Sequence, residues 1–338
     1  MKTKQLRKEE QLYEFCRDVI CVQGGYHGVT TASDEVSTTL NDNPRSLETR
    51  AAWIHLVPMP NHYRGLHRLS SNEYNEENLR SLATEYAGLV REKIHRLKES
   101  GIVPAAFIAE PLSGNAGGVI LPPTYLAQVY EMIHEIGGLC INDEVQVGYG
   151  RLGNVFWGFE EHGIVPDIIT MAKAAGNGHP LGFVVTSEQI AKEFYESQGS
   201  FFSSAGGGPV SCVVGSTVLS IIEEEELQAN ALEVGKYLNE RLWAVQKKFP
   251  HIVGCIHGHG LYQGIEIIKP DGSISANNAP APGTQEAYKI CDRLLQLGVI
   301  SHNTGDYSNV LKVKPPLCIT REDADFFCEA LEITLSGF

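Results

Sequence analysis

The sequence lacks any long run of apolar residues that is free of charge. No stretch reaches the roughly 18 residues that would indicate a membrane-spanning helix, and residues 1–11 have no apolar core of a signal peptide. Basic residues are outnumbered by acidic ones, 27 against 41, which gives a net charge of −14. This charge argues against nucleic-acid and anionic-membrane partners, and we expect a cytoplasmic protein.

Metal and hydrolase motifs are also missing. The eight cysteines are scattered without a CxxC pair, the twelve histidines form no HExxH motif, and no GxSxG motif is present. These absences argue against a zinc or disulfide framework and against the common metal-dependent and serine hydrolases. We predict no metal site and interpret the cysteines as reduced, mostly buried residues.

Apolar runs alternate with helical patterns in the first two thirds of the chain. Runs at 102–110, 138–143 and 167–172 read as buried strands, and residues 125–136 have helical apolar spacing. This alternation predicts an α/β fold with a mainly parallel sheet and helices on both faces. The length of 338 residues allows one domain or two. We expect a large domain at 1–222 and a smaller α+β domain at 223–338.

Local patterns predict the remaining elements. Residues 4–16 have helical composition, and residues 29–70 hold several prolines, which predicts an irregular surface excursion. Asn75 and Thr320 are expected N-caps of helices. The other expected elements are helices at 76–99, 210–232, 235–248 and 284–297, a strand at 182–186, a hairpin within 254–268, and strands near Val299 and Val310.

Asp143 and Lys173 each follow an apolar run. Asp143 ends the run 138–142, and Lys173 follows the run 167–172. Ligands of open α/β sheets bind outside the carboxyl ends of the strands, so the two side chains could face one ligand. A lysine amine forms a Schiff base with pyridoxal phosphate (PLP), whose ring nitrogen needs an acid beside it. On spacing alone, a strand-end cap and a solvated loop lysine are the commoner roles.

The wording of this region resembles the cofactor motifs of the class III aminotransferases, which are PLP-dependent enzymes of fold type I that act on ornithine and omega-amino acids. The two matching segments read NDEVQVGYGRLG and PDIITMAKAAGNGHPLG. The resemblance extends over nearly the whole chain from Asp18. It implies an aminotransferase that moves an amino group between an amine or amino acid and a 2-oxo acid. It also implies PLP as the cofactor and a homodimer with shared active sites.

The resemblance assigns the central roles to three residues of these segments. Lys173 would bond the cofactor and then serve as the general acid and base that moves the substrate proton. Asp143 would pair with the ring nitrogen, and Gln146 would contact the phenolic oxygen. The chemical logic is general, because a partly neutral lysine and a cationic ring are what this proton transfer needs.

Two further segments supply the remaining contacts that the resemblance implies. Tyr26 and His27 belong to a Tyr-His-Gly motif at the cofactor, with Tyr26 stacked on its ring. An ordinary core tyrosine in a turn would give the same short motif. Ser204 lies in the glycine-rich loop GSFFSSAGGGP, at the position of a family threonine that reaches the cofactor phosphate of the partner subunit. A glycine-rich loop can bind phosphate, but alone it is more often a turn.

Departures from the family pattern leave two reactions as alternatives, amino transfer and phosphate elimination. Many transaminases have a glutamate where this chain has Asn115 and a substrate-binding arginine where it has Lys312. A lysine cannot hold a carboxylate through two parallel hydrogen bonds. These changes resemble the phospho-lyase branch, whose members eliminate phosphate from ethanolamine phosphate or phosphohydroxylysine. Neutral variation at solvated positions explains them equally well. His257 replaces another common arginine, and we interpret it as a structural substitution.

The start of the chain also departs from the family. Family members have well over a hundred residues before the Tyr-His-Gly motif, including a Gly-Ser turn that binds the cofactor phosphate, whereas 25 residues precede Tyr26 here. The resemblance therefore implies that the N-terminal part of the large domain is missing. An inactive truncated fragment is the non-enzyme alternative to the two enzyme hypotheses.

Overall fold

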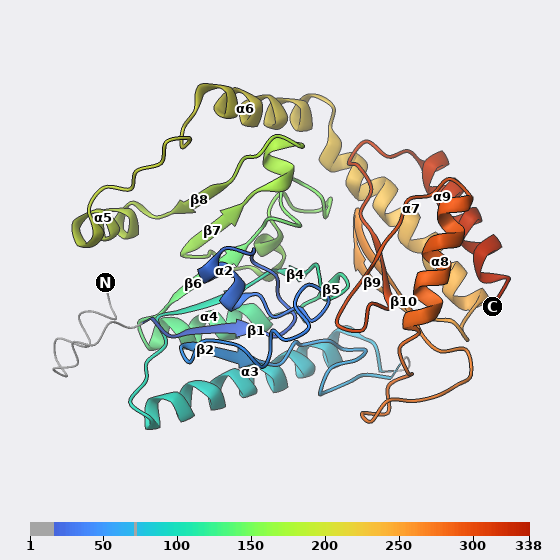
Figure 1. Ribbon diagram of the computed structural model, residues 1–338, viewed down its shortest axis with the longest axis horizontal. Helices are drawn as coiled ribbons and strands as arrows, with labels where there is room; N and C mark the ends of the chain where they lie inside the picture. The colour runs from blue at the N-terminus through green and yellow to red at the C-terminus, as the bar shows by residue number, and fades with distance from the viewer. Residues whose placement is uncertain (1–16, 71–72) are drawn as a thin grey trace.

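The computed structural model describes residues 17–70 and 73–338, and Figure 1 shows two sheets with helices packed on them. The larger sheet has six strands in the order β2-β1-β3-β6-β7-β8, and the smaller has four in the order β11-β12-β10-β9. The helix expected at 4–16 lies outside the described residues.

The six-stranded sheet confirms the mainly parallel arrangement. Neighbouring strands from β2 to β7 run parallel, and β8 is antiparallel to β7. The apolar and β-branched sequences of β1, β3 and β6 suit strands that are covered on both faces. The bounds are β1 (Val19–Val22), β2 (Ile54–Val57), β3 (Ala106–Ala109), β6 (Leu139–Asp143), β7 (Ile168–Met171) and β8 (Phe183–Thr186).

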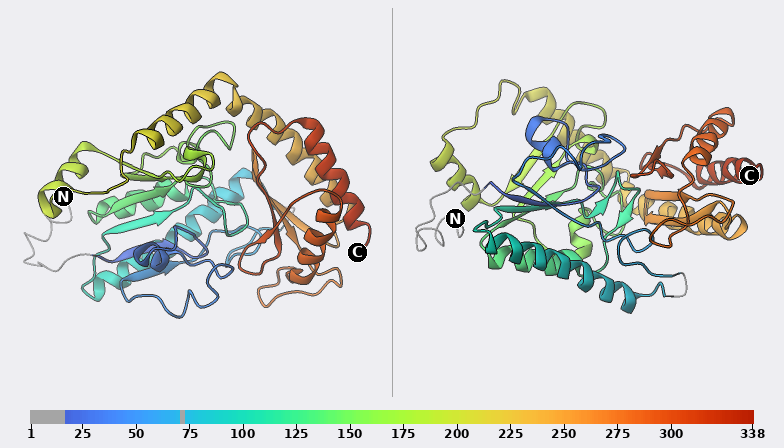
Figure 2. Two further views of the ribbon diagram at one scale, coloured as in Figure 1. Left: turned by 45° about the horizontal axis from the view of Figure 1, so that its top comes forward. Right: turned by 60° about the horizontal axis from the view of Figure 1, so that its bottom comes forward.

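Helices cover both faces of this sheet. Helices α3 (Glu76–Glu99) and α4 (Tyr125–Glu135) pack on one face, as Figures 1 and 2 show. The short α2 (Thr31–Val36) contributes Val36 to the core on the other face. Asn75 caps α3 as predicted, because its side chain accepts a hydrogen bond from the Asn78 backbone amide at 2.9 Å.

The C-terminal part is built on the antiparallel four-stranded sheet. Strands β9 and β10 form the predicted hairpin, and three helices pack on the sheet through one apolar core. The predicted cap of the last helix is confirmed, since Thr320 Oγ1 accepts from the Asp323 amide at 3.2 Å. The bounds are α7 (Leu227–Lys248), β9 (Val253–His259), β10 (Tyr262–Ile267), α8 (Thr284–Gln296), β11 (Asn303–Thr304), β12 (Val310–Val313) and α9 (Arg321–Leu335).

Shorter elements connect the two sheets. The helices α5 (Glu188–Gln198) and α6 (Pro209–Glu224) follow β8, and α6 leads into α7. The division of the chain between residues 222 and 223 stays a prediction. The remaining elements are β4 (Leu112–Ser113), β5 (Val119–Ile120) and the 3-10 helices η1 (Gly158–His162) and η2 (Lys173–Gly176).

Three local expectations are wrong. Residues 29–70 contain α2 and β2, because pairing with β1 imposes a strand that the local sequence does not indicate. The expected helix at 210–232 is interrupted where Glu226 adopts a left-handed backbone, with φ of 50°, between α6 and α7. Val299 lies before the next strand, which begins at Asn303.

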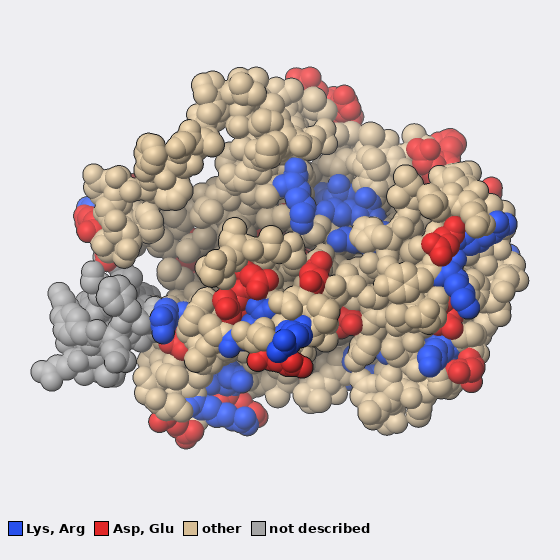
Figure 3. All heavy atoms as spheres, in the orientation of Figure 1, with Lys and Arg blue, Asp and Glu red and all other residues tan. Residues whose placement is uncertain are grey.

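The arm formed by β8, α5 and α6 exposes apolar side chains. Val184 is 69% exposed, Val210 70% and Val213 65%, and Figure 1 shows α5 standing away from the sheet. On the face in Figure 3, this arm carries few charged side chains. Among the helices of the described residues, none combines the length and the apolar character that crossing a membrane requires. The cytoplasmic location stays a prediction.

Gly235 tests the packing of α7 against the β9–β10 turn. A Cβ at this position would collide with the backbone of Gly260, which cannot swing aside as a side chain would. We expect Gly235→Ala to lower the free energy of unfolding by about 1–3 kcal/mol in denaturant titrations. Gly88→Ala is the matched control, because nothing lies within 4 Å of its added Cβ and alanine favours a helix by roughly 0.5–1 kcal/mol. Equal stability of the two variants would contradict this packing.

Candidate active site

Polar side chains gather where neighbouring parallel strands of the large sheet end. Tyr26 and His27 follow β1, Glu110 follows β3, Asp143 ends β6, and Lys173 follows β7. These strands are adjacent in the order β1-β3-β6-β7, and parallel strands end at one edge of a sheet. The fold therefore brings Asp143 and Lys173 to the same edge, where open α/β sheets bind ligands.

Asp143 is buried and held in one orientation. It is 4% exposed; its Oδ2 lies 2.7 Å from His27 Nδ1, and its Oδ1 accepts from the Val145 amide at 3.0 Å. Burial alone would lower the pKa of His27, but the hydrogen bond and charge of Asp143, with the charge of Glu110, raise it. A carboxylate offers about four acceptor positions, so Asp143 can accept a further donor.

Lys173 occupies a strained position beside the Tyr26 ring. Its φ of 45° lies in the left-handed region, which a non-glycine residue adopts rarely and most often at functional sites. Its Nζ lies 5.8 Å from the centre of the Tyr26 ring. The residue is exposed overall, yet desolvation lowers the pKa of its amine against the opposing charges of Glu110 and Asp143. A lowered pKa increases the neutral fraction that can act as nucleophile or base.

Glu110 fixes the loops on either side of the site. Its Oε1 accepts from the Tyr26 amide at 3.2 Å and its Oε2 from the Gly114 amide at 2.9 Å. Burial and the nearby charge of Asp143 raise the pKa of Glu110. This acid also ends an apolar run in the sequence, at 102–110, where we predicted no site role for it. The pattern that identified Asp143, an apolar run that ends in an acid, also identifies Glu110.

Two lysines from β12 and the segment after it reach the same region. Lys314 Nζ donates to Gln146 Oε1 at 2.5 Å, and Lys312 Nζ donates to Asn115 Oδ1 at 3.1 Å. Asn115 in turn donates to Asp42 Oδ2 at 2.9 Å. The side chains at the two positions that depart from the family pattern, 115 and 312, therefore form a hydrogen bond with each other. Sequence reasoning gave Lys314 no role, although it lies two residues from Lys312.

These lysines form a basic group with Arg151 and Lys173. Burial, followed by the charges of Arg151, Lys312 and Lys173, lowers the pKa of Lys314 to about 6. Burial and the charge of Lys173 also lower the pKa of Lys312. Figure 3 shows basic side chains gathered in a hollow near the middle of the molecule. Mutual repulsion of this kind is relieved when an anion binds.

The donor set fits the cofactor that the sequence resemblance implies. Lys173 supplies an amine, Asp143 a buried carboxylate with free acceptor capacity, and Tyr26 an aromatic face. Gln146 is also buried and lies near Glu110, since both would be close to a Cβ on Gly114. Ser204 is exposed in the loop between α5 and α6, and its role stays a prediction.

The family model and the curated relatives that match this chain indicate the same family. The family model described as aminotransferase class-III matches residues 1–335. A curated relative from Arabidopsis thaliana, alanine–glyoxylate aminotransferase 2 homolog 2, mitochondrial, is 37% identical, and the alignment covers 96% of this chain and 63% of the relative. The chain thus spans about 60–65% of the length of the first curated relatives that it matches.

Solved structures of similar fold include two enzymes with different names. A phospholyase from Arthrobacter in complex with phosphoethanolamine has a TM-score of 0.84 and 30% identity, over 100% of this chain and 74% of that one. A PLP-bound amine transaminase from an uncultivated Pseudomonas species has a TM-score of 0.82 and 28% identity, over 95% of this chain and 69% of that one.

The His27–Asp143 pair predicts a pH-dependent contribution to stability. Because the pKa of His27 is raised on folding, its charged pair stabilises the fold fully below the unfolded pKa near 6.5 and is lost as pH rises through the folded value. We expect His27→Gln to cost about 1–3 kcal/mol of unfolding free energy at low pH and less as pH rises. Denaturant titrations across pH measure this difference.

His95→Gln is the control for that experiment. His95 is 74% exposed on α3 and pairs with Glu99 in solvent, so its loss has little effect at any pH. A His27→Gln cost that stays constant or grows with pH would contradict a charged, buried pair.

Proposed function

The chain belongs to the class III aminotransferase family, and from this premise we propose that it is a PLP-dependent enzyme that moves an amino group between an amine or amino acid and a 2-oxo acid. The observation that carries the proposal is the delivery of Lys173 and Asp143 to one sheet edge by the adjacent parallel strands β7 and β6. Tyr26 beside the Lys173 amine completes a set suited to a planar, electron-withdrawing cofactor.

Each residue would hold a different part of the bound cofactor. When bound, PLP supplies an electron sink for the substrate carbon that loses a proton. Asp143 would hold the ring nitrogen, and His27 fixes the orientation of that carboxylate. Tyr26 would cover one ring face, and Gln146 would contact the phenolic oxygen. Ser204 of a second copy would bind the phosphate.

Lys173 carries the proton transfer in this proposal. Its lowered pKa increases the neutral fraction of the amine, the form that can accept the proton from the substrate Cα and return it elsewhere. Glu110 and Asp143 bear negative charge beside it and stabilise the ammonium form when the proton arrives.

A homodimer follows from the same proposal. The arm of β8, α5 and α6 exposes apolar side chains, with Val184, Val210 and Val213 at 65–70% exposure. Exposed apolar surface of this kind is typical of a protein interface. The loop that carries Ser204 joins α5 to α6 within this arm. A second copy that covered the arm would therefore lie against the loop expected to contribute to a shared site.

A phospho-lyase is the second candidate, favoured by the lysines at positions 312 and 314. Point charges suit a phosphate group, whereas a substrate carboxylate is held best by a bidentate arginine. The charge of Lys312 lowers the pKa of Lys314, and the charge of Lys173 lowers the pKa of both lysines; a bound dianion would raise both pKa values again. In this alternative, loss of phosphate from ethanolamine phosphate replaces transfer of the amino group to the 2-oxo acid.

One pair of assays separates the candidates. Transamination predicts alanine formation when pyruvate and an amine donor are supplied with PLP, whereas the lyase predicts phosphate release from ethanolamine phosphate without any keto acid. Lys173→Ala should lower either rate by about 10²–10⁴-fold, and Lys98→Ala, at an exposed position of α3, should leave it unchanged. Phosphate release without a keto acid would overturn the aminotransferase proposal.

Cofactor binding distinguishes both enzymes from an inactive fragment. We expect added PLP to give a visible absorbance band in the wild type that Lys173→Ala lacks. A chain that shows no Lys173-dependent band would contradict both enzyme proposals.

The basic group predicts a pH-dependent anion affinity. Because the pKa of Lys314 is lowered to about 6, its protonated fraction rises as pH falls through that value, and sulfate should bind more tightly. Sulfate stays a dianion over this range, so calorimetric titration reports the protein alone. Lys314→Met should remove the pH dependence, and Lys98→Met, on exposed α3, should keep it. Sulfate affinity that is independent of pH would contradict an anion site at Lys314.

A further inference from the structure

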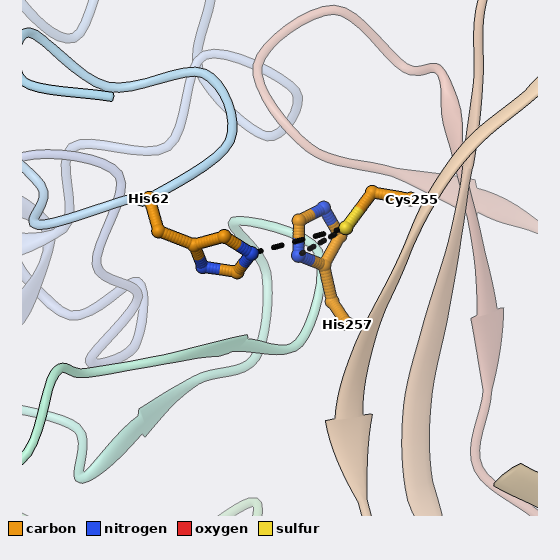
Figure 4. Close-up of side chains that lie close together, drawn as sticks. All are labelled: His62, Cys255 and His257. Carbon is orange, nitrogen blue, oxygen red and sulfur yellow. Dashed lines mark hydrogen bonds between the residues drawn. The ribbon is translucent and has the colours of Figure 1, made fainter. Parts of the chain in front are cut away.

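A second cluster of reactive side chains lies away from the lysine site. Cys255 Sγ lies 3.9 Å from His62 Nε2 and 4.0 Å from His257 Nδ1, and the three ligand atoms lie within 4.8 Å of one another. Figure 4 shows the two imidazole rings and the thiol pointing toward one another. Cys255 and His257 are buried.

The fold positions these groups from two separate segments. Cys255 and His257 are two residues apart on β9, so the alternation of a strand directs both to one face. His62 comes from the loop after β2, which lies against that face. Gly254 permits the close approach, since a Cβ there would collide with the Tyr63 hydroxyl. The cluster thus joins the large-sheet segment to the small sheet.

His257 is oriented from its other ring nitrogen. Its Nε2 lies 2.6 Å from Glu266 Oε2 on β10, which leaves Nδ1 directed at Cys255. Glu266 is itself fixed by an ion pair with Arg64 and by a hydrogen bond from Asn309 Nδ2 at 3.3 Å. A carboxylate that holds the second nitrogen of a histidine is typical of metal ligands, because it sets the tautomer and raises the basicity of the coordinating nitrogen.

We propose that His62, Cys255 and His257 bind a zinc ion. Zinc bonds of about 2.3 Å to sulfur and 2.0–2.1 Å to nitrogen at tetrahedral angles place sulfur and nitrogen about 3.5 Å apart. The observed sulfur–nitrogen separations of 3.9 and 4.0 Å exceed that value by no more than about half an ångström, a shift that side-chain torsions supply. Thiolate and imidazole are ligands that zinc prefers.

The cluster leaves room for a fourth ligand. A cavity of about 530 Å³ borders His62 and Cys255 and is also lined by Tyr63, Tyr74 and Trp243. Three protein ligands with an open fourth position allow water to complete the tetrahedron. The ion would link the loop after β2 to β9, in addition to the Arg64–Glu266 ion pair, which already joins that loop to β10.

The other group of this type among the described residues is less suitable. It consists of His134, Cys140 and Asp167. Asp167 Oδ2 already lies 2.7 Å from His134 Nε2 and accepts from the Cys140 amide at 2.8 Å. The Asp167 carboxylate oxygen that faces His134 and Cys140 therefore already has two hydrogen-bond partners. In the cluster of His62, Cys255 and His257, the thiol and the two imidazoles instead point toward one another.

Cobalt spectroscopy on the full chain tests the zinc site. Co²⁺ bound by one thiolate and two imidazoles should give a near-ultraviolet sulfur-to-metal charge-transfer band and visible d–d bands, at one equivalent, and added zinc should abolish both. Cys255→Ser should lose the charge-transfer band. His62→Gln, a loop variant chosen because it spares the buried β9, should weaken metal binding by about tenfold or more.

Two variants serve as controls, Cys212→Ser at an exposed cysteine and His95→Gln at an exposed histidine. Both should keep the wild-type bands, and circular dichroism checks that each variant is folded. The proposal is overturned if the wild type shows no d–d bands, or if the charge-transfer band persists in Cys255→Ser. Neither outcome bears on Lys173, because the readout requires no PLP.

Discussion

Parallel pairing between β6 and β7 is the constraint on which the candidate active site depends. The register sets Asp143 opposite Thr170, so Lys173, three residues further along, leaves the sheet at the same edge as the acid. A shift of one residue would turn the side chains of β6 to the other face and remove Asp143 from the site. β1 and β3 extend the same edge and add Tyr26, His27 and Glu110.

Burial at this edge shifts acids and bases in opposite directions. Desolvation raises the pKa of Glu110 and lowers the pKa values of Lys173 and Lys314, while the Asp143 charge raises that of His27. Such divergence is common where a site must both hold and move protons. A bound cofactor or anionic substrate would change these pKa values, because it would add its own charges to the site.

The local sequence was sufficient to predict elements that are set by nearby residues, such as helix caps and buried strands. The caps at Asn75 and Thr320 and the strands that carry Asp143 and Lys173 are of this kind. Strand β2 is stabilised by pairing with β1. The prolines around it instead indicated irregular structure, so the local sequence did not predict the strand. Lys314 contacts Gln146 across 168 positions, and Cys255 contacts His62 across 193. No motif spacing indicates such contacts, because the two sheets must first pack together. For this reason we predicted no metal site from the sequence and interpreted His257 as a structural substitution.

The identity of the lysine that bonds PLP decides whether this sheet edge is the cofactor site. Incubation of the full chain with PLP, reduction with borohydride and peptide mass spectrometry identify the lysine that carries a pyridoxyl group. We expect that group on the peptide containing Lys173, with Asp143→Asn lowering its yield because the ring nitrogen loses its acid. Labelling spread over exposed lysines such as Lys98 and Lys192, or unchanged by Lys173→Ala, would contradict the assignment of this sheet edge as the cofactor site.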